Sequence, residues 1–248
     1  LQNLVAYKNS DHKVVYAWFD NSEKTPFSRG QHISDAPDSL DVISMMYPAE
    51  LAAFELVDMQ TVHAKGTKVV YTISFDKIQK EYTEKVKEGT ETGSFDTYLK
   101  SEMDKQIGYA GSFDGMITEY KGNNPIYMSA EQKAEAKKYQ DIFFSAVLTW
   151  KTANADKLLT FQGYPENLIE QTILTNCKHI ILATDNVTDD AQLSVFARLA
   201  MAAAGVPTDR FVVAVSTASL DASDKQTGFY GTCLLYTSDA ADDRISVD

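Results

Sequence analysis

The sequence is short of positive charge and of long apolar runs. It has 23 lysine and arginine residues against 35 aspartate and glutamate residues, and its formal net charge is −12 over 248 residues. Such a chain has no basic surface to neutralise phosphates, which argues against nucleic acid or an anionic membrane as a partner. No segment approaches the roughly 20 apolar residues that cross a bilayer. We therefore expect no membrane insertion within this segment, and a neutral ligand.

Cysteine and histidine are also scarce. The two cysteines, Cys177 and Cys233, lack the spacing of metal ligands. No glycine-rich phosphate loop follows an apolar segment. The four histidines lie at unrelated positions: His12, His32, His63 and His179. We therefore expect neither a metal nor a cofactor.

The last residues differ in character from the rest of the chain. The segment "CLLYTSDAADDRISVD", residues 233–248, resembles the translation of a sequencing-library adapter with a barcode-like "RIS". We therefore predict one natural domain over residues 1–232 and a non-native tail over 233–248. The alternative is a natural acidic C-terminus, and rereading the DNA around codon 233 distinguishes the two.

Seven apolar segments have the composition of buried strands. They cover residues 13–20, 40–47, 67–76, 113–120, 157–163, 179–185 and 210–216. Helical patterns lie between them. Near-continuous apolar strands that alternate with helices indicate a parallel sheet covered by helices on its outside. Seven such units fall one short of a (β/α)8 TIM barrel, so we predict an α/β barrel truncated before its eighth strand, which would lie beyond Gly231.

Two helices show recognisable starts. Ser129 and Gln132 form a capping-box pattern, and Thr188 is the predicted cap of a later helix that ends at Gly205. The apolar positions of that later helix are predicted to pack on the sheet: Leu193, Phe196, Ala197, Ala200, Met201 and Ala204. Residues 87–99 are predicted to form a loop.

In a parallel barrel, the ligand site is built from the carboxyl ends of the strands and the loops after them. The residues there are aromatic rings, amides and carboxylates, which suit a carbohydrate. The substrate-binding candidates are Trp18, Tyr47, Phe75, Glu119, Tyr120, Gln162, Tyr164 and Asp185. The alternative is that the aromatic rings only close the top of the barrel core.

The fourth apolar segment carries the most specific motif. Its "FDGMITEYK", residues 113–121, resembles the fourth-strand signature of glycoside hydrolase family 18, the chitinases and endo-β-N-acetylglucosaminidases, whose usual form is "FDGxDxDxE" on a (β/α)8 barrel. By this resemblance, Asp114 stands at the first aspartate, Ile117 at the second and Glu119 at the third. Lys121 stands at the catalytic glutamate.

These departures argue against the family's chemistry. The resemblance implies a substrate-assisted mechanism, in which the glutamate protonates the leaving oxygen. A lysine, with an ordinary pKa near ~10.4, is a poor proton donor at neutral pH. Three interpretations stay open for Glu119 and Lys121: an ion pair in a retired catalytic site, an unusual active site in which Glu119 is the acid, or a barrel end with another role.

We therefore expect a carbohydrate-binding barrel without hydrolysis, whose ligand is an N-glycan or a chitooligosaccharide. The rival is an active endo-β-N-acetylglucosaminidase or chitinase, and a third possibility is a structural or protein-binding barrel. The resemblance also implies a bacterial protein exported to the cell surface or periplasm as a lipoprotein, with partners in a glycan-uptake system. The chain begins at Leu1, so an export signal would lie outside this sequence.

Overall fold

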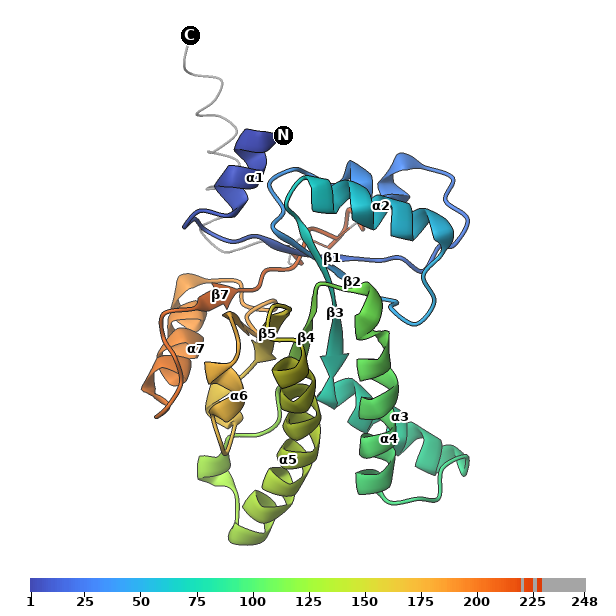
Figure 1. The fold of residues 1–248 in the computed structure, drawn as a ribbon. Helices are drawn as coiled ribbons and strands as arrows, with labels where there is room; N and C mark the ends of the chain where they lie inside the picture. Colours follow the sequence, from blue (N-terminus) through green and yellow to red (C-terminus); the bar gives the residue numbers. More distant parts are fainter. Residues whose placement is uncertain (220, 225–226, 229–248) are drawn as a thin grey trace.

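The computed structural model describes residues 1–219, 221–224 and 227–228. Its centre is one sheet of seven strands in chain order (Figure 1), and each strand pairs in parallel with the next. The strands are β1 (Tyr16–Phe19), β2 (Val42–Met45), β3 (Lys68–Ser74), β4 (Gly115–Tyr120), β5 (Leu158–Gly163), β6 (His179–Leu182) and β7 (Phe211–Val213). All seven predicted strands are confirmed, each shorter than its predicted range.

The sheet curls into an incomplete barrel, as shown by side chains that meet across its concave side. The hydroxyl oxygen of Tyr16 on β1 lies 2.9 Å from Thr160 Oγ1 on β5 and 2.7 Å from His179 Nδ1 on β6. In a flat sheet, β1 and β5 would be about 19 Å apart. The predicted truncated TIM barrel is thus confirmed as a curled half-barrel of parallel strands.

Helices connect the strands and cover the outside of the sheet, except for the first, which precedes β1 and has no buried residue (Figure 1). They are α1 (Gln2–Lys8), α2 (Ala53–Ala64), α3 (Phe75–Glu88), α4 (Phe95–Ile107), α5 (Ala130–Ala153), α6 (Thr172–Thr175) and α7 (Asp190–Ala202). Short 3-10 turns are η1 (Arg29–Gln31), η2 (Ile33–Asp35), η3 (Gly108–Ser112), η4 (Pro125–Tyr127) and η5 (Pro165–Asn167). In the part of the chain that the structure describes, no helix has both the length and the apolar character needed to cross a bilayer.

The helix ends confirm one predicted cap and correct another. Ser129 and Gln132 form the reciprocal capping box that starts α5. At α7, however, the cap is Asp189, whose side chain accepts a hydrogen bond from the Gln192 N–H at 2.8 Å. The prediction of Thr188 was wrong by one residue, since the backbone leaves the extended conformation only after Asp189.

Two further expectations about helices were confirmed only in part. The predicted loop over 87–99 is shorter, because α3 continues to Glu88 and α4 already begins at Phe95, capped by Ser94. The face predicted for α7 does not pack fully on the sheet: only Ala200 in this helix is buried, and Met201 is 57% exposed. The alanine-rich end of α7 therefore lies largely against solvent.

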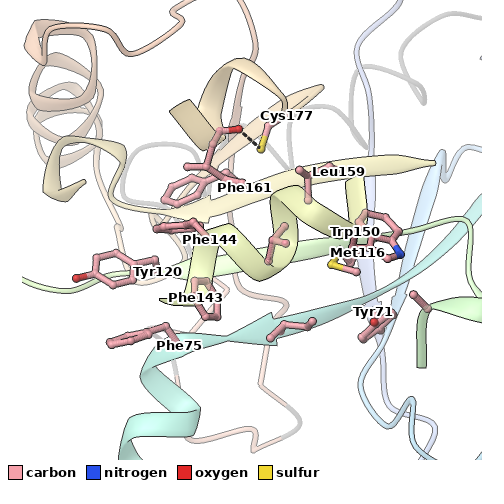
Figure 2. Packing of buried hydrophobic residues seen from close by; sticks show 14 of the residues in the cluster. Tyr71, Phe75, Met116, Tyr120, Phe143, Phe144, Trp150, Leu159, Phe161 and Cys177 are labelled. Carbon is pink, nitrogen blue, oxygen red and sulfur yellow. Dashed lines mark hydrogen bonds between the residues drawn. The ribbon is translucent and has the colours of Figure 1, made fainter. Parts of the chain in front are cut away.

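Side-chain alternation divides the core into two clusters on either side of the sheet. The larger cluster lies between the sheet and the helices and includes the fully buried rings of Tyr71, Phe143 and Phe161 (Figure 2). The smaller cluster fills the barrel interior with Val42, Val70, Ile117, Ile181 and Ala214. The interior is therefore packed in its middle, and polar groups remain at its two ends.

Candidate functional site

An open cavity of about 840 Å³ lies at the carboxyl ends of the strands, where parallel barrels form their ligand sites. We call it the mouth cavity. Inward-facing side chains from β1 to β5 line it: Trp18, Ser44, Thr72, Ser74, Glu119 and Gln162. Residues that follow β3, β6 and β7 add to the polar lining, among them Lys77, Asp185, Ser216 and Thr217.

Three polar side chains form a row across neighbouring strands of the mouth cavity. Ser74 on β3 pairs in register with Glu119 on β4, which pairs with Gln162 on β5. The Ser74 hydroxyl donates to Glu119 Oε1 at 2.6 Å. The Gln162 Oε1 atom is buried and has no hydrogen-bond partner among the described residues. This row therefore contains a fixed carboxylate beside an amide with unused hydrogen-bonding capacity.

The rest of the mouth cavity offers a ring and a second carboxylate. Trp18 on β1 is 40% exposed, so part of its ring is open to a ligand. Asp185 follows β6, and the Ser216 hydroxyl donates to its main-chain oxygen at 2.8 Å. Thr184 ties the same segment to Ala214, since its Oγ1 atom both donates to and accepts from that residue's backbone at 2.9 Å. These contacts join the ends of β6 and β7.

The motif residues of β4 separate into different environments. Asp114 lies at the amino end of the strand, far from the mouth cavity, where it accepts from the Val69 N–H at 2.7 Å and pairs with His63 Nε2 at 2.6 Å. Burial raises the pKa of Asp114, but its bonds with His63 and Val69 outweigh burial and hold the pKa below its usual value. Ile117 is 0% exposed within the interior cluster.

Lys121 follows the last residue of β4 and does not line the mouth cavity. Its main chain is fixed from two sides: its N–H donates to Asp76 Oδ2 at 2.8 Å, and its carbonyl accepts from Asn167 Nδ2 at 2.8 Å. Within the described residues, Glu119 bonds with Ser74 and forms no ion pair with Lys121, contrary to the first of the three interpretations. The reason is that Lys121 lies beyond the strand, where the alternation of inward and outward side chains no longer applies.

Four of the predicted contact residues lie outside the mouth cavity. Phe75 and Tyr120 are 4% and 3% exposed and face the helices, with ring centroids 4.9 Å apart. Tyr164 stacks on Phe196 of α7 with ring centroids 5.8 Å apart. Tyr47 is 48% exposed, and its main chain bonds with the Asn21 side chain. The cavity therefore brings together Trp18, Glu119, Gln162 and Asp185 from the predicted set.

Several polar lining residues were not predicted from the sequence, among them Ser44, Thr72 and Lys77. Ser44 and Thr72 face the interior next to each other, with their hydroxyl oxygens 3.1 Å apart. Both could have been found, because each stands two residues after an inward valine on its strand. Lys77 lies in the first turn of α3 and carried no signal, since residues after a strand do not follow its alternation. Among the described residues, no group of three or more acidic, histidine or cysteine side chains could hold a metal ion.

Comparison with known proteins identifies the family. The model of glycoside hydrolase family 18, BT1044-like, matches residues 1–236, whereas no curated protein matches the chain. Among solved structures, the apo endo-β-N-acetylglucosaminidase from Cordyceps militaris has a TM-score of 0.62 at 14% identity, covering 95% of this chain and 79% of that one. A selenomethionine form of a BT1044 variant has a TM-score of 0.60 at 15% identity, covering 87% and 70%.

A family 18 chitinase from Pseudoalteromonas aurantia has a TM-score of 0.54 at 10% identity, covering 89% of this chain and 86% of that one. At such identities these structures share the fold alone with this chain. The family model, in contrast, spans nearly the whole sequence and includes the β4 motif and all seven strands. The chain therefore belongs to glycoside hydrolase family 18, in its BT1044-like group.

Proposed function

We propose that this protein binds a carbohydrate containing N-acetylglucosamine in its mouth cavity and does not hydrolyse it. The ligand is an N-glycan or a chitooligosaccharide, the classes suggested by the names of the endo-β-N-acetylglucosaminidase and the chitinase with this fold. The partly exposed ring of Trp18 offers a stacking surface for a sugar. Gln162, Asp185 and Glu119 offer hydrogen bonds at its edge.

The proposal that the protein does not hydrolyse its ligand rests on one observation, namely which residues occupy the motif positions and where their side chains lie relative to the cavity. A general acid must lie within hydrogen-bond reach of the leaving oxygen. Lys121, at the acid position, lies outside the mouth cavity, and its ammonium group is a weak acid. Ile117, where the family has its second aspartate, is apolar and fully buried. Neither residue can perform the step that the family's motif performs.

A second candidate function is hydrolysis with Glu119 as the acid. It is favoured by the position of Glu119, which lines the mouth cavity and has one oxygen, Oε2, that accepts no hydrogen bond from the described residues. The experiment is incubation with high-mannose and complex N-glycans and with chitooligosaccharides, in which binding and product release are measured together. We expect saturable binding and no product.

Two variants make the test specific. Trp18→Ala should weaken binding about tenfold or more, whereas Phe27→Ala, which removes an 84% exposed ring elsewhere, should leave it unchanged. Turnover that disappears in Glu119→Gln would overturn the non-catalytic proposal in favour of the second candidate. A protein that binds none of these sugars would instead be a structural or protein-binding barrel.

The cellular setting is part of the same proposal. A cavity for external glycans suits a bacterial protein exported to the cell surface or periplasm, as a lipoprotein that acts with partners in glycan uptake. Fractionation of cells that express the complete reading frame tests this: the protein should be found in the membrane or periplasmic fraction. Recovery from the cytoplasm alone would contradict it.

A further inference from the structure

A second cavity, of about 510 Å³, lies on the outer side of the sheet. Its walls are α3, the segment that follows β4, and the first half of α5. We call it the outer cavity. It shares no lining residue with the mouth cavity. Residues adjacent in the chain line different cavities. Ser74 and Glu119 line the mouth cavity, whereas the next residues, Phe75 and Tyr120, line the outer one.

The floor of the outer cavity is aromatic. Phe75 and Tyr120 lie side by side there, packed against Phe143 and Phe144 of α5 (Figure 2). The Tyr120 hydroxyl accepts from Gln140 Nε2 at 3.0 Å, which fixes the ring. The floor is therefore rigid, and its rings are held by the core of the protein.

The rim of the outer cavity carries a ring and amides that are not engaged elsewhere. Tyr127 is 87% exposed, although it lines the cavity. The side chains of Gln79 and Asn123 are exposed, and among the described residues they make no hydrogen bond. An amide can donate and accept at once, which matches the hydroxyl groups of a sugar. Among the described residues, Glu135 is the one charged group that lines the cavity, and no lysine or arginine does, which disfavours an anionic ligand.

The rim is anchored to the floor. A Cβ atom added to Gly122 would lie 2.6 Å from a Tyr120 ring carbon, and the φ angle of this glycine is +55°. Only glycine lets the chain pass so closely over that ring. The Asp76 carboxylate also accepts from the Lys121 and Gly122 N–H groups. The segment with Asn123 and Tyr127 thus leaves β4 in a defined direction.

From this geometry we propose that the outer cavity is a second carbohydrate site, which takes neutral sugar units stacked on Tyr127 and bonded by Gln79 and Asn123. Its volume is within the range of small-molecule sites, roughly 300–1,000 Å³. The choice of ligand class rests on the proposed function, but the two sites are tested separately. An oligosaccharide has the apolar faces and hydroxyl edges that the exposed Tyr127 ring and the amides of the rim would recognise.

The two tryptophans allow the sites to be observed independently. Trp18 lines the mouth cavity, whereas Trp150 is 8% exposed and lines neither cavity. Tryptophan fluorescence therefore reports the mouth, and calorimetry reports both sites. Chitotetraose and a high-mannose N-glycan are the probes. We expect calorimetry to show two binding events with at least one of them, of which only one changes the fluorescence.

The variant Tyr127→Ala should weaken the fluorescence-silent event about tenfold and leave the fluorescence titration unchanged. Ile126→Ala is the matched control, because this neighbour is 79% exposed but does not line the outer cavity. Gln79→Ala should act like Tyr127→Ala. A single event visible in both methods, or a second event that none of these variants alters, would overturn the outer site alone. No binding by either method would overturn both proposals.

Discussion

Ile117 shows how little room the barrel interior has for a second carboxylate. It lies on β4, two residues before Glu119, and its side chain is 0% exposed among Val70, Ile181 and Ala214. Its register partners on β3 and β5 are Thr72 and Thr160, whose hydroxyl groups already bond with Ser44 and Tyr16. An aspartate at this position would be cut off from water and surrounded mostly by apolar groups that cannot solvate it.

We therefore expect Ile117→Asp to lower the free energy of unfolding by at least about 3 kcal/mol. Ile117→Val is the control, since it only removes a methylene and should cost about 1 kcal/mol. Urea unfolding of both variants gives the comparison. Equal losses in the two variants would mean that the interior can hydrate a charge, contrary to the packing described above.

At the scale of strands and helices, the predictions that succeeded were those with repeated signals. The seven strands were found because each is a run of apolar residues, and α5 because Ser129 and Gln132 signal its start twice. The start of α7 was misplaced because Thr188 and Asp189 are both good caps in adjacent positions. The backbone decides between them, and its path depends on contacts that lie far away in the sequence.

The site residues with a repeated signal in the sequence were likewise the easier ones to place. Trp18, Glu119 and Gln162 lie within strands near their carboxyl ends, and the structure places all three on the inner face. Phe75 and Tyr120 were assigned to the wrong cavity, because a shift of one residue moves a side chain to the opposite face of a sheet. Lys77, which also lines the mouth cavity, lies after a strand, where the two-residue alternation of side chains does not apply.

The cap of α7 can be tested directly. Asp189→Ala should lower the free energy of unfolding by about 1 kcal/mol and speed amide exchange in α7, because the Gln192 N–H loses its acceptor. Thr188→Ala is the matched control and should leave exchange in α7 unchanged. The opposite order of effects, measured by hydrogen exchange, would place the cap at Thr188 after all.

At the scale of the whole molecule, one half-buried histidine connects distant parts of the barrel. His179 on β6 meets the Tyr16 hydroxyl of β1, which also meets Thr160 of β5. Burial lowers the pKa of His179 to about 4, from an ordinary value of 6.5. The ring is therefore neutral in the folded protein near neutral pH. Protonation of this ring lowers the free energy of unfolding.

The sign of the pH effect follows from these two values. Between about pH 6.5 and 4, the unfolded chain binds a proton at His179 that the folded protein does not bind. The free energy of unfolding should therefore fall as the pH decreases through this window, by up to about 3 kcal/mol. His179→Gln should flatten that part of the stability curve, as measured by urea unfolding at several pH values.

His12→Gln is the control for this measurement. Its hydrogen bond with Asp41 raises the pKa of His12, so this histidine contributes to stability at low pH and loses that contribution as the pH rises. Removing it should leave the loss of stability at acidic pH in place. Identical slopes in wild type and His179→Gln would show that other groups cause the acid sensitivity.

The beginning of α3 has a consequence for how the two cavities would influence each other. Within four consecutive residues, Ser74 and Lys77 line the mouth cavity, Phe75 lines the outer cavity, and Asp76 holds the end of β4. Ser74 accepts from the Lys77 N–H, and Phe75 is packed into the rigid aromatic floor, so this turn is a fixed partition between the two cavities. The two sites should therefore fill independently, since by thermodynamic reciprocity a ligand that leaves the affinity of the other site unchanged keeps its own affinity unchanged in return.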